Sequence, residues 1–384
     1  MDTITIDEAC DVLNGYAFKS NKYTSSGIRI IRIANVQKGY IEDNSPVFYP
    51  INSVGLDKFM LKENDLLLSL TGNVGRTALL TKEMLPAALN QRVACLRLKT
   101  NKITNKYLFH LLNSNYFESK CIQSSQGIAQ KNMSTEWLKS YELPIYSLSK
   151  QNEITTILDN IRNTIDLKEQ QLQKYDELIK ARFIEMFDDA PVKKIEDVCE
   201  SFKIGPFGSA LHKNEISDNG YSFVLGTDNA VKNEFAYDEI RYINEEKYHQ
   251  LENYKVNPGE IIMSMMGTVG RVAIIPENIG TAIISSHLCI LRVNKNIMLP
   301  EFFHLAFCKD NNIQFQIEGI HNGSIMKGFN LKIVKAFEIK CPNIKEQKEF
   351  VKFAKQVDKS KLVVQKSLEK TQQLFDSLMQ EYFG

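Results

Sequence analysis

The chain contains the stretch DLLLSLTGNVGR at residues 65–76 and the stretch EIIMSMMGTVGR at residues 260–271. Matching residues lie 195 positions apart, since 271 − 76 = 195, and Ser, Gly, Val, Gly and Arg recur at this offset. The units of solenoid proteins run to only about 50 residues, so a period near two hundred indicates two copies of a whole domain. These copies are called module 1 and module 2 below.

Other segments recur in the same order in both modules. Each module opens with a glycine followed closely by an aromatic residue, at Gly15 and Gly205. Runs of alternating apolar residues, typical of half-buried strands, occur at 28–36, 94–98, 223–231 and 289–293. Helix-like stretches follow at 106–112 and 301–307. The sequence therefore predicts an α+β fold with two similar β-rich modules.

A long amphipathic helix follows each module. Apolar residues spaced by three and four form a heptad seam in both helices, with Lys168, Lys361 and Thr371 at polar seam positions. The first seam contains Ile154, Leu158, Ile161, Ile165, Leu172, Tyr175 and Ile179. The second contains Phe350, Ala354, Val357, Val364, Leu368, Phe375, Leu378 and Tyr382. We expect the helices to pair as an antiparallel coiled coil, and the alternative is that they fold back and cap the modules.

Helix signals give the expected boundaries. Ser147 and Asn343 occupy N-cap positions, each shortly after a proline. A helix over residues 150–187 would extend roughly 55 Å at 1.5 Å per residue. The predicted segments are module 1 at 1–149, a spacer helix at 150–188, module 2 at 189–344 and a second spacer helix at 345–384.

Composition is that of a folded protein, with 43% hydrophobic and 24% charged residues. No apolar stretch approaches the roughly 20 residues that span a bilayer, and the N-terminus lacks the pattern of an export signal. The seven cysteines are odd in number and never spaced as CxxC, which favours reduced thiols in a cytoplasm. The net charge of +1 argues against an autonomous DNA-binding domain, although it can conceal a basic groove.

The chain combines two β-rich modules, each followed by a coiled-coil helix, with the Ser-x-x-Gly-x-x-Gly-Arg segments and the endings FIEMFDD and LMQEYFG. This combination resembles the specificity subunit of type I restriction-modification systems. The resemblance covers essentially the whole chain. It implies that each module is a target recognition domain for one half of a bipartite sequence in double-stranded DNA. It also implies that the helices set the spacer and dock two methyltransferase subunits, with restriction subunits as further partners.

The resemblance places the chemistry outside this chain. S-adenosylmethionine, ATP and Mg would be used by the partner subunits, and no cofactor or metal is expected here. The residues agree: Asn257-Pro258-Gly259 lacks the second proline and the aromatic residue of the adenine methyltransferase motif, and the six histidines show no ligand spacing. Asn64 and Gly259 instead suit a turn before a strand.

The first candidate DNA contacts lie in the duplicated Gly-x-x-Gly-Arg segments. Their backbone could approach phosphate, with charge supplied by Arg76 and Arg271 and polar contacts from Asn73 and Thr268. The alternative is a tight turn in which glycine supplies positive φ and arginine is solvated. The Lys-Ser or Lys-Thr of a nucleotide-binding loop is absent.

A second set of candidates lies where the modules differ. Asn90-Gln91-Arg92 precedes a strand in module 1, and Ser285-Ser286-His287 stands at the same place in module 2. Asn and Gln can bond to adenine and Arg to guanine, so unlike side chains on a shared frame suit two unlike half-sites. Ordinary loop drift is the alternative. Further candidates for DNA contact are Lys19, Asn35, Gln126, Lys131, Thr227, Asn229, Asn322 and Lys327.

The leading hypothesis from the sequence is therefore a non-catalytic DNA-recognition subunit. One rival is a coiled-coil adaptor whose two modules bind protein, which explains the near-neutral charge more easily. Another is a self-contained modification enzyme, and the absence of a cofactor or catalytic motif counts against it.

Overall fold

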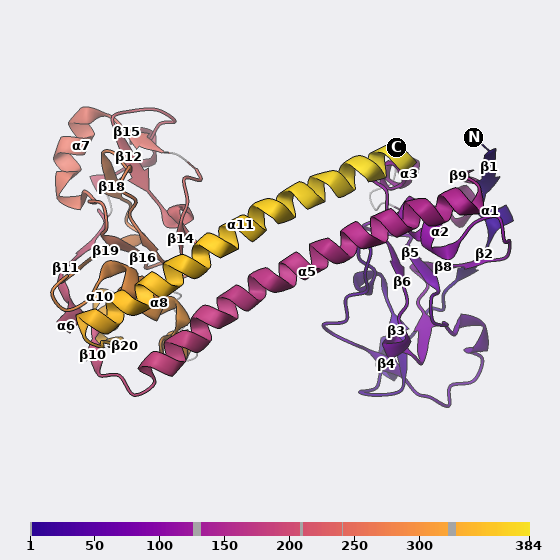
Figure 1. Cartoon of the computed structure of the whole chain (residues 1–384), viewed down its shortest axis with the longest axis horizontal. Helices are drawn as coiled ribbons and strands as arrows, with labels where there is room; N and C mark the ends of the chain where they lie inside the picture. Colours follow the sequence, from indigo (N-terminus) through magenta and orange to yellow (C-terminus); the bar gives the residue numbers. More distant parts are fainter. Residues whose placement is uncertain (1, 126–131, 208–209, 240, 322–327) are drawn as a thin grey trace. The chain divides into compact units, whose positions relative to one another are not determined.

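The computed structural model describes residues 2–125, 132–207, 210–239, 241–321 and 328–384. The chain forms two compact units (Figure 1). Unit 1 contains residues 1–169 and 366–384, and unit 2 contains residues 170–365. Each unit therefore holds one module together with parts of both long helices.

Unit 1 is built on a four-stranded antiparallel sheet. Its strands, in spatial order, are β2 (Cys10–Asn14), β8 (Val93–Leu98), β5 (Leu66–Ser69) and β6 (Thr77–Leu79). A second sheet has the order β4 (Phe48–Tyr49), β3 (Ile28–Ile31) and β7 (Ala87–Leu89), with β3 parallel to β7. The terminal strand β1 (Asp2–Thr5) pairs with β9 (Glu142–Ile145).

Unit 2 repeats this arrangement. Its four-stranded sheet contains, in order, β11 (Cys199–Ile204), β19 (Leu288–Val293), β16 (Ile261–Ser264) and β17 (Val272–Ile274). Its second sheet contains β15 (Tyr242–Ile243), β12 (Ser222–Leu225) and β18 (Ala282–Ile284). The short pairs are β10 (Val192–Lys194) with β20 (Glu338–Lys340) and β13 (Ala230–Val231) with β14 (Glu234–Phe235). The predicted α+β duplication is confirmed.

The unbroken apolar run at the start of the duplicated stretch is explained by burial on both faces of the sheet. Successive side chains of a strand point to opposite faces. Leu66 and Leu68 lie in one hydrophobic cluster of unit 1, and Leu67 lies in another. In unit 2, Ile261 and Ile262 are divided between two clusters in the same way. Strands β5 and β16 thus each separate two cores.

Helices cover one face of each four-stranded sheet. The helices in unit 1 are α1 (Ile6–Ala9), α2 (Asn105–Leu112), α3 (Asn115–Ser124) and α4 (Thr135–Ser140). Those in unit 2 are α6 (Ile195–Val198), α8 (Pro300–Lys309), α9 (Asn311–His321) and α10 (Leu331–Ala336), whereas α7 (Glu245–Leu251) packs against the second sheet. The predicted helices at 106–112 and 301–307 are confirmed. Sequence periodicity missed α3 and α9, which follow directly after them.

The two long helices, α5 (Leu148–Phe187) and α11 (Ile344–Phe383), pair in both units and run in opposite directions (Figure 1). In unit 1, Lys168 Nζ of α5 donates a hydrogen bond to the Thr371 hydroxyl of α11. In unit 2, Lys361 Nζ of α11 lies 2.9 Å from both carboxylate oxygens of Asp176 in α5. The polar seam positions therefore face partners on the other helix, and the predicted antiparallel coiled coil is confirmed.

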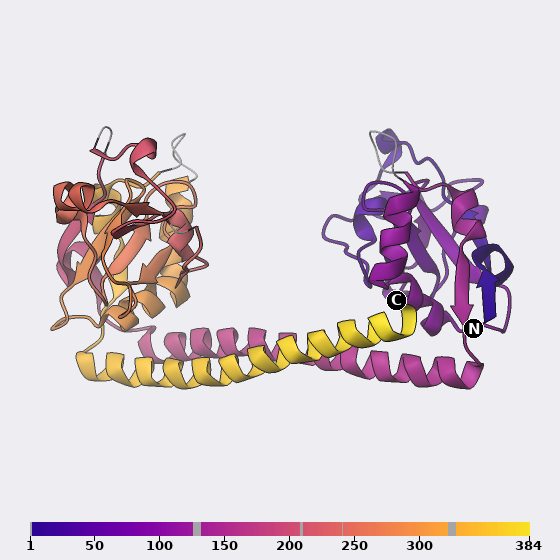
Figure 2. The same cartoon turned by 90° about the horizontal axis from the view of Figure 1, so that it is seen from above.

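The last turns of each long helix pack into the module that the helix does not follow. Phe183 and Phe187, near the end of α5, belong to the core of unit 2. Phe375 and Phe383, near the end of α11, belong to the core of unit 1, where both ends of the chain lie (Figure 2). The endings FIEMFDD and LMQEYFG thus complete the core of the other module in each case.

The predicted helix N-cap at Asn343 and the predicted turn residues Asn64 and Gly259 are also confirmed. The side chain of Asn343 accepts a hydrogen bond from the backbone N–H of Glu346 at 3.1 Å, as an N-cap does. Asn64 and Gly259 both have positive φ, at 65° and 77°. Among the described residues, no helix combines the length and the apolar character that crossing a membrane requires.

Candidate nucleic-acid interface

The duplicated Ser-x-x-Gly-x-x-Gly-Arg segments form the hairpin turns β5–β6 and β16–β17. The hydroxyl of Ser69 accepts a hydrogen bond from the backbone N–H of Arg76 at 3.0 Å, and Ser264 does the same for Arg271 at 2.9 Å. The glycines of these turns have positive φ, as at Gly72 with 68°. Such φ values favour glycine. The expected tight turn with glycines at positive φ is present, but the arginines are half-buried rather than fully solvated, and their contact with phosphate stays a prediction.

The second glycine of each turn is required by a neighbouring helix. A Cβ atom at Gly75 would lie 2.9 Å from the side chain of Cys121 in α3. At Gly270 it would lie 3.2 Å from Ile317 in α9 and from Phe329. The duplicated segment therefore preserves a frame on which α3 and α9 rest, and this explains its recurrence without any role in chemistry.

The two arginines of the turns differ in their surroundings. Arg76 is half-buried, and its guanidinium donates a hydrogen bond to the Gln37 side chain. Arg271 is also half-buried, but within the part of the chain that the structure describes its guanidinium has no hydrogen-bond or ion-pair partner. Asn73 and Thr268 are exposed at the tips of the turns. Of the two arginines, Arg76 is held by a neighbouring side chain, whereas Arg271 has no such partner among the described residues.

The turn at Asn90-Gln91-Arg92 joins the two sheets of module 1, because it lies between β7 and β8. Ser285-Ser286-His287 joins β18 to β19 in module 2. The two turns are closed by the same backbone hydrogen bond, from Val93 to Asn90 at 2.9 Å and from Leu288 to Ser285 at 3.2 Å. Gln91, Arg92 and His287 are exposed, whereas Asn90 and Ser286 are half-buried. One backbone geometry therefore presents different polar groups in the two modules.

The glycine-aromatic segments lie against these same turns. A Cβ atom at Gly15 would meet the backbone of Asn90 at 2.2 Å, and one at Gly205 would meet the carbonyl oxygen of Ser285 at 1.9 Å. Only glycine fits such an approach. The aromatic residues next in the chain remain accessible, with Tyr16 37% and Phe207 66% exposed. The sequence points to these segments but not to their contact with the turns at 90–92 and 285–287.

Two of the predicted contact residues hold turns instead. Asn35 is buried, and its side-chain oxygen accepts from the backbone N–H of Arg32 at 2.9 Å while its amide nitrogen donates to the carbonyl of Glu42 at 2.8 Å. Asn229 is fully buried and makes the equivalent bonds. Burial removes these two amides from the set of side chains able to reach a base, so we correct their assignment to a structural role.

The remaining predicted residues are less informative. Lys19 is exposed just before a 3-10 turn, and Thr227 is half-buried at the start of the 3-10 turn that ends at Asn229. Four more predicted contacts lie outside the described residues: Gln126, Lys131, Asn322 and Lys327. For all of them, DNA contact stays a prediction.

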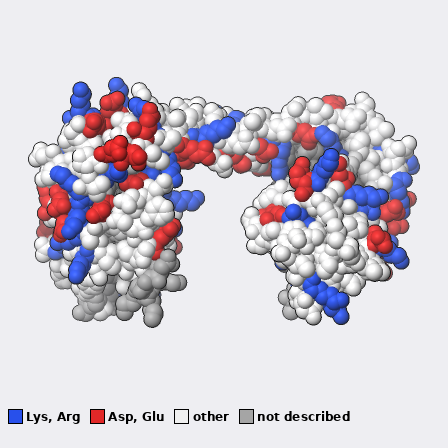
Figure 3. Space-filling view, turned by 90° about the horizontal axis from the view of Figure 1, so that it is seen from below, with Lys and Arg blue, Asp and Glu red and all other residues white. Residues whose placement is uncertain are grey.

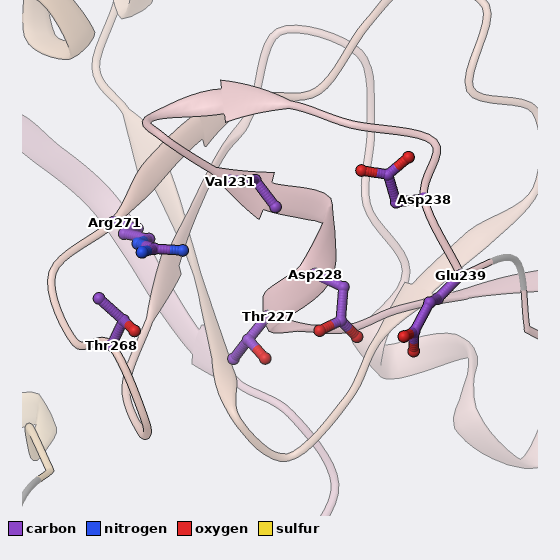
Figure 4. A pocket seen from close by; sticks show the side chains of 7 residues that line it. All are labelled: Thr227, Asp228, Val231, Asp238, Glu239, Thr268 and Arg271. Carbon is purple, nitrogen blue, oxygen red and sulfur yellow. The ribbon is translucent and has the colours of Figure 1, made fainter. Parts of the chain in front are cut away.

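A cavity of about 320 Å³ in module 2 brings three of the predicted residues together (Figure 4). Its lining consists of Thr227, Asp228, Val231, Asp238, Glu239, Thr268 and Arg271. Arg241 lies 2.7 Å from Asp228 and also pairs with Glu239. The cavity therefore combines the guanidinium of Arg271, which has no partner among the described residues, with three carboxylates, two of which pair with Arg241.

The cysteines contribute to the cores. Burial raises the pKa of the Cys10 and Cys289 thiols to about 12, so both remain protonated near neutral pH. All seven cysteines are unpaired. Five of them are buried and act as small apolar side chains, whereas Cys199 and Cys308 are half-buried.

Comparison with known proteins gives these features a family. The family model for the type I restriction modification DNA specificity domain matches residues 1–175 and again residues 188–372. The chain belongs to this family. Each match contains one module and most of the helix that follows it.

Relatives of this specificity-domain chain support the assignment over its whole length. The EcoBI specificity subunit of Escherichia coli is 23% identical over 99% of this chain and 85% of its own length. The EcoAI specificity subunit of Escherichia coli is 32% identical over 40% of this chain and 26% of its own length. Both relatives are named as subunits of type I restriction enzymes.

Solved structures show the same fold. The S subunit of the type I restriction-modification system from M. genitalium aligns over 100% of this chain and 96% of its own, with a TM-score of 0.54 and 17% identity. A chain from a study of complex assembly and conformational transition of the type I R-M system aligns with a TM-score of 0.62 and 13% identity, covering 100% and 97%. The duplicated specificity-domain fold is thus shared.

Charge is finely mixed on the face of this specificity-domain chain that Figure 3 presents. Lysine and arginine lie beside aspartate and glutamate in both units, and wide areas carry neither sign. DNA-binding surfaces usually gather positive charge, which neutralises phosphates without reading sequence. On the face shown, the described residues form no continuous basic stripe.

Proposed function

We propose that this chain is the DNA sequence-recognition subunit of a type I restriction-modification complex, in which each module reads one half of a bipartite target. The observation that carries the proposal is the pair of equivalent turns at 90–92 and 285–287. The two turns share their place between the two sheets and their closing hydrogen bond, but they differ in every side chain. A protein whose two similar modules read different DNA sequences needs this combination of one backbone frame and different side chains.

The side chains at these turns suit the major groove. Gln91 can bond to adenine through both ends of its amide, and Arg92 can donate two hydrogen bonds to guanine. Both are exposed, as is His287 in module 2. The close approach of Gly15 and Gly205 fixes the backbone beneath these turns, so the readers are held on a rigid support.

The paired helices serve as the spacer and as the docking surface for two methyltransferase subunits, with restriction subunits completing the complex. The names of the relatives, which are specificity subunits of type I restriction enzymes, support this assembly. Adenine methylation from S-adenosylmethionine, and translocation with ATP and Mg, belong to those partners. Base flipping for methylation belongs to them as well. This chain contributes recognition and spacing, and it is not an enzyme.

The competing function is a coiled-coil adaptor with two protein-binding modules. Mixed surface charge favours it, but membership of the DNA specificity family over both modules favours recognition. Salt separates the two functions. Retention of DNA by phosphate contacts weakens as salt rises, whereas an adaptor retains no DNA at any salt concentration.

The test replaces Asn90-Gln91-Arg92 by Ser-Ser-His and selects bound sequences from a random DNA library with the assembled methyltransferase complex. We expect a changed motif in one half-site, with the other half-site and the spacing unchanged. Lys82→Ala, at an exposed site elsewhere in module 1, is the control and leaves the motif intact. An unchanged motif in the turn variant would remove these residues from the reading surface.

A further inference from the structure

The buried asparagines align the two modules residue by residue around the cavity of module 2. Asn35 and Asn229 make matching bonds to the carbonyls of Glu42 and Ala236, at 2.8 and 2.9 Å. Since 229 − 35 = 194 and 236 − 42 = 194, the hairpins that follow these asparagines have the same length. Residues of one hairpin can therefore be compared directly with those of the other.

This register shows that two amide side chains of module 1 are replaced in module 2 by an apolar side chain and a carboxylate. Gln37 and Asn44 of module 1 correspond to Val231 and Asp238 of module 2, since 231 − 37 = 194 and 238 − 44 = 194. In module 1 the Gln37 amide accepts a hydrogen bond from the turn arginine, Arg76. The side chain of Val231 has no hydrogen-bond acceptor. The guanidinium N–H donors of Arg271 therefore remain available to another molecule.

One carboxylate of the cavity is likewise unused. Arg241 engages Asp228 and Glu239, whereas Asp238 has no side-chain partner within the described part of the chain. Asp238 and Arg271 both line the cavity, and Figure 4 places them on different sides of it. A strong donor and a strong acceptor therefore face a common space that is open to a ligand.

Phosphate is a poor ligand for this place. Three carboxylates line the cavity with Arg271, and Arg241 pairs with two of them, so the local charge is still −1 and disfavours an anion. The ligand must instead carry hydrogen-bond acceptors on one side and a donor on the other. In the major groove, a G·C pair presents the O6 and N7 acceptors of guanine beside the N4 donor of cytosine.

We propose that this cavity of module 2 reads one G·C base pair, with Arg271 donating to guanine O6 and N7 and Asp238 accepting from cytosine N4. The assignment rests on the proposed function, and it extends that function to one base pair of one half-site. An A·T pair fits less well, because the N6 amino group of adenine lies beside N7 and opposes the second donor of a guanidinium. Module 1, with Gln37 and Asn44, has no such charge pair.

The experiment determines the motif bound by the assembled complex from a random DNA library, for the wild type and for Arg271→Gln, Arg271→Lys and Asp238→Asn. We expect each variant to lose about 10-fold or more of the preference for G·C at one position, the same position for all three. The other half-site keeps its motif. Arg76→Gln, the matched variant in module 1, leaves that G·C position unchanged.

Other outcomes overturn the assignment. A uniform loss of affinity with an intact motif would make Arg271 a phosphate contact. Altered preferences at different positions for Arg271 and Asp238 would separate the two residues. If the wild-type complex enriches no bipartite motif at all, the proposed function itself fails, and this result is distinct from a wild-type motif that the variants do not change. Circular dichroism of each variant confirms folding.

Discussion

Gln151 and Gln347 occupy equivalent places near the starts of α5 and α11, and each bonds through both ends of its amide to the module that precedes it. The side-chain oxygen of Gln151 accepts from the backbone N–H of Thr104 at 2.9 Å, and that of Gln347 accepts from Leu299 at 2.8 Å. Both side chains are fully buried. The duplication therefore extends to the joint between each module and its helix.

Replacing Gln151 by leucine leaves the backbone carbonyl of Lys102 and the backbone N–H of Thr104 without their partners in two part-buried hydrogen bonds. We expect the free energy of unfolding to fall by about 2–3 kcal/mol. Chemical denaturation followed by circular dichroism measures the change. Gln170→Leu, at an exposed position of the same helix, should alter stability by no more than about 0.5 kcal/mol. Equal effects at the two positions would contradict an anchoring role.

The end of α11 should be essential to unit 1. Phe383 is 5% exposed and packs edge-on against Tyr107, with ring centroids 5.3 Å apart. Phe383→Ala is expected to destabilise unit 1 by about 3–4 kcal/mol and to increase hydrogen exchange there, with unit 2 unaffected. Leu374→Ala removes an apolar side chain that is 52% exposed and serves as the control. Unchanged exchange in the Phe383 variant would show that the helix end is dispensable.

The stability contributed by the contact between α2 and α5 should depend on pH. Hydrogen bonds from His110, and then from Lys106, lower the pKa of Asp159 to about 2. A carboxyl group whose pKa is lowered by folding stabilises the protein above its usual pKa, and this contribution is lost as pH falls through the folded value. The carboxylate is 31% exposed, so solvent screening reduces the contribution to about 1 kcal/mol.

The variant Asp159→Asn should therefore be about 1 kcal/mol less stable than the wild type at pH 6. The difference should shrink between about pH 4 and pH 2. Urea denaturation at several pH values measures it. Asp166→Asn, on an exposed turn of the same helix, should show no such convergence. A difference that stays constant down to pH 2 would exclude this carboxylate as its origin.

Removal of one heptad from each long helix tests the spacer proposal. Seven residues at 1.5 Å per residue shorten each helix by about 10 Å, close to the length of three base pairs. We expect both half-site motifs to remain, with a spacing reduced by about three base pairs or with binding lost. Selection from a library of variable spacers gives the readout. A bipartite motif with its original spacing would rule out the helices as the spacer.

Much of the fold could be predicted from local patterns. The 195-residue repeat, the strand at 94–98 and the heptad seams depend on spacing along the chain, which records which face of an element is apolar. The N-cap at Asn343 and the left-handed Asn64 are equally local. These features were correctly predicted because each is set by residues a few positions apart.

The candidate site was harder to predict because contact between distant segments decides which polar groups stay free. Asn35 and Asn229 look like readers in the sequence, yet burial commits their amides to turns. Arg76 and Arg271 look identical in the sequence, yet Gln37 bonds to Arg76, whereas Val231 cannot bond to Arg271, which has no partner within the described residues. No spacing rule distinguishes these cases.

The sequence by itself determined the duplication, the α+β class and the antiparallel helix pair, because each depends on periodic apolar residues. Only the tertiary structure decided that Phe187 and Phe383 complete the core of the module their helix does not follow. It also decided that Arg271 and Asp238 face one cavity. The type of a residue shows whether its side chain avoids water or attracts an opposite charge. Only the folded chain determines which distant residue it contacts.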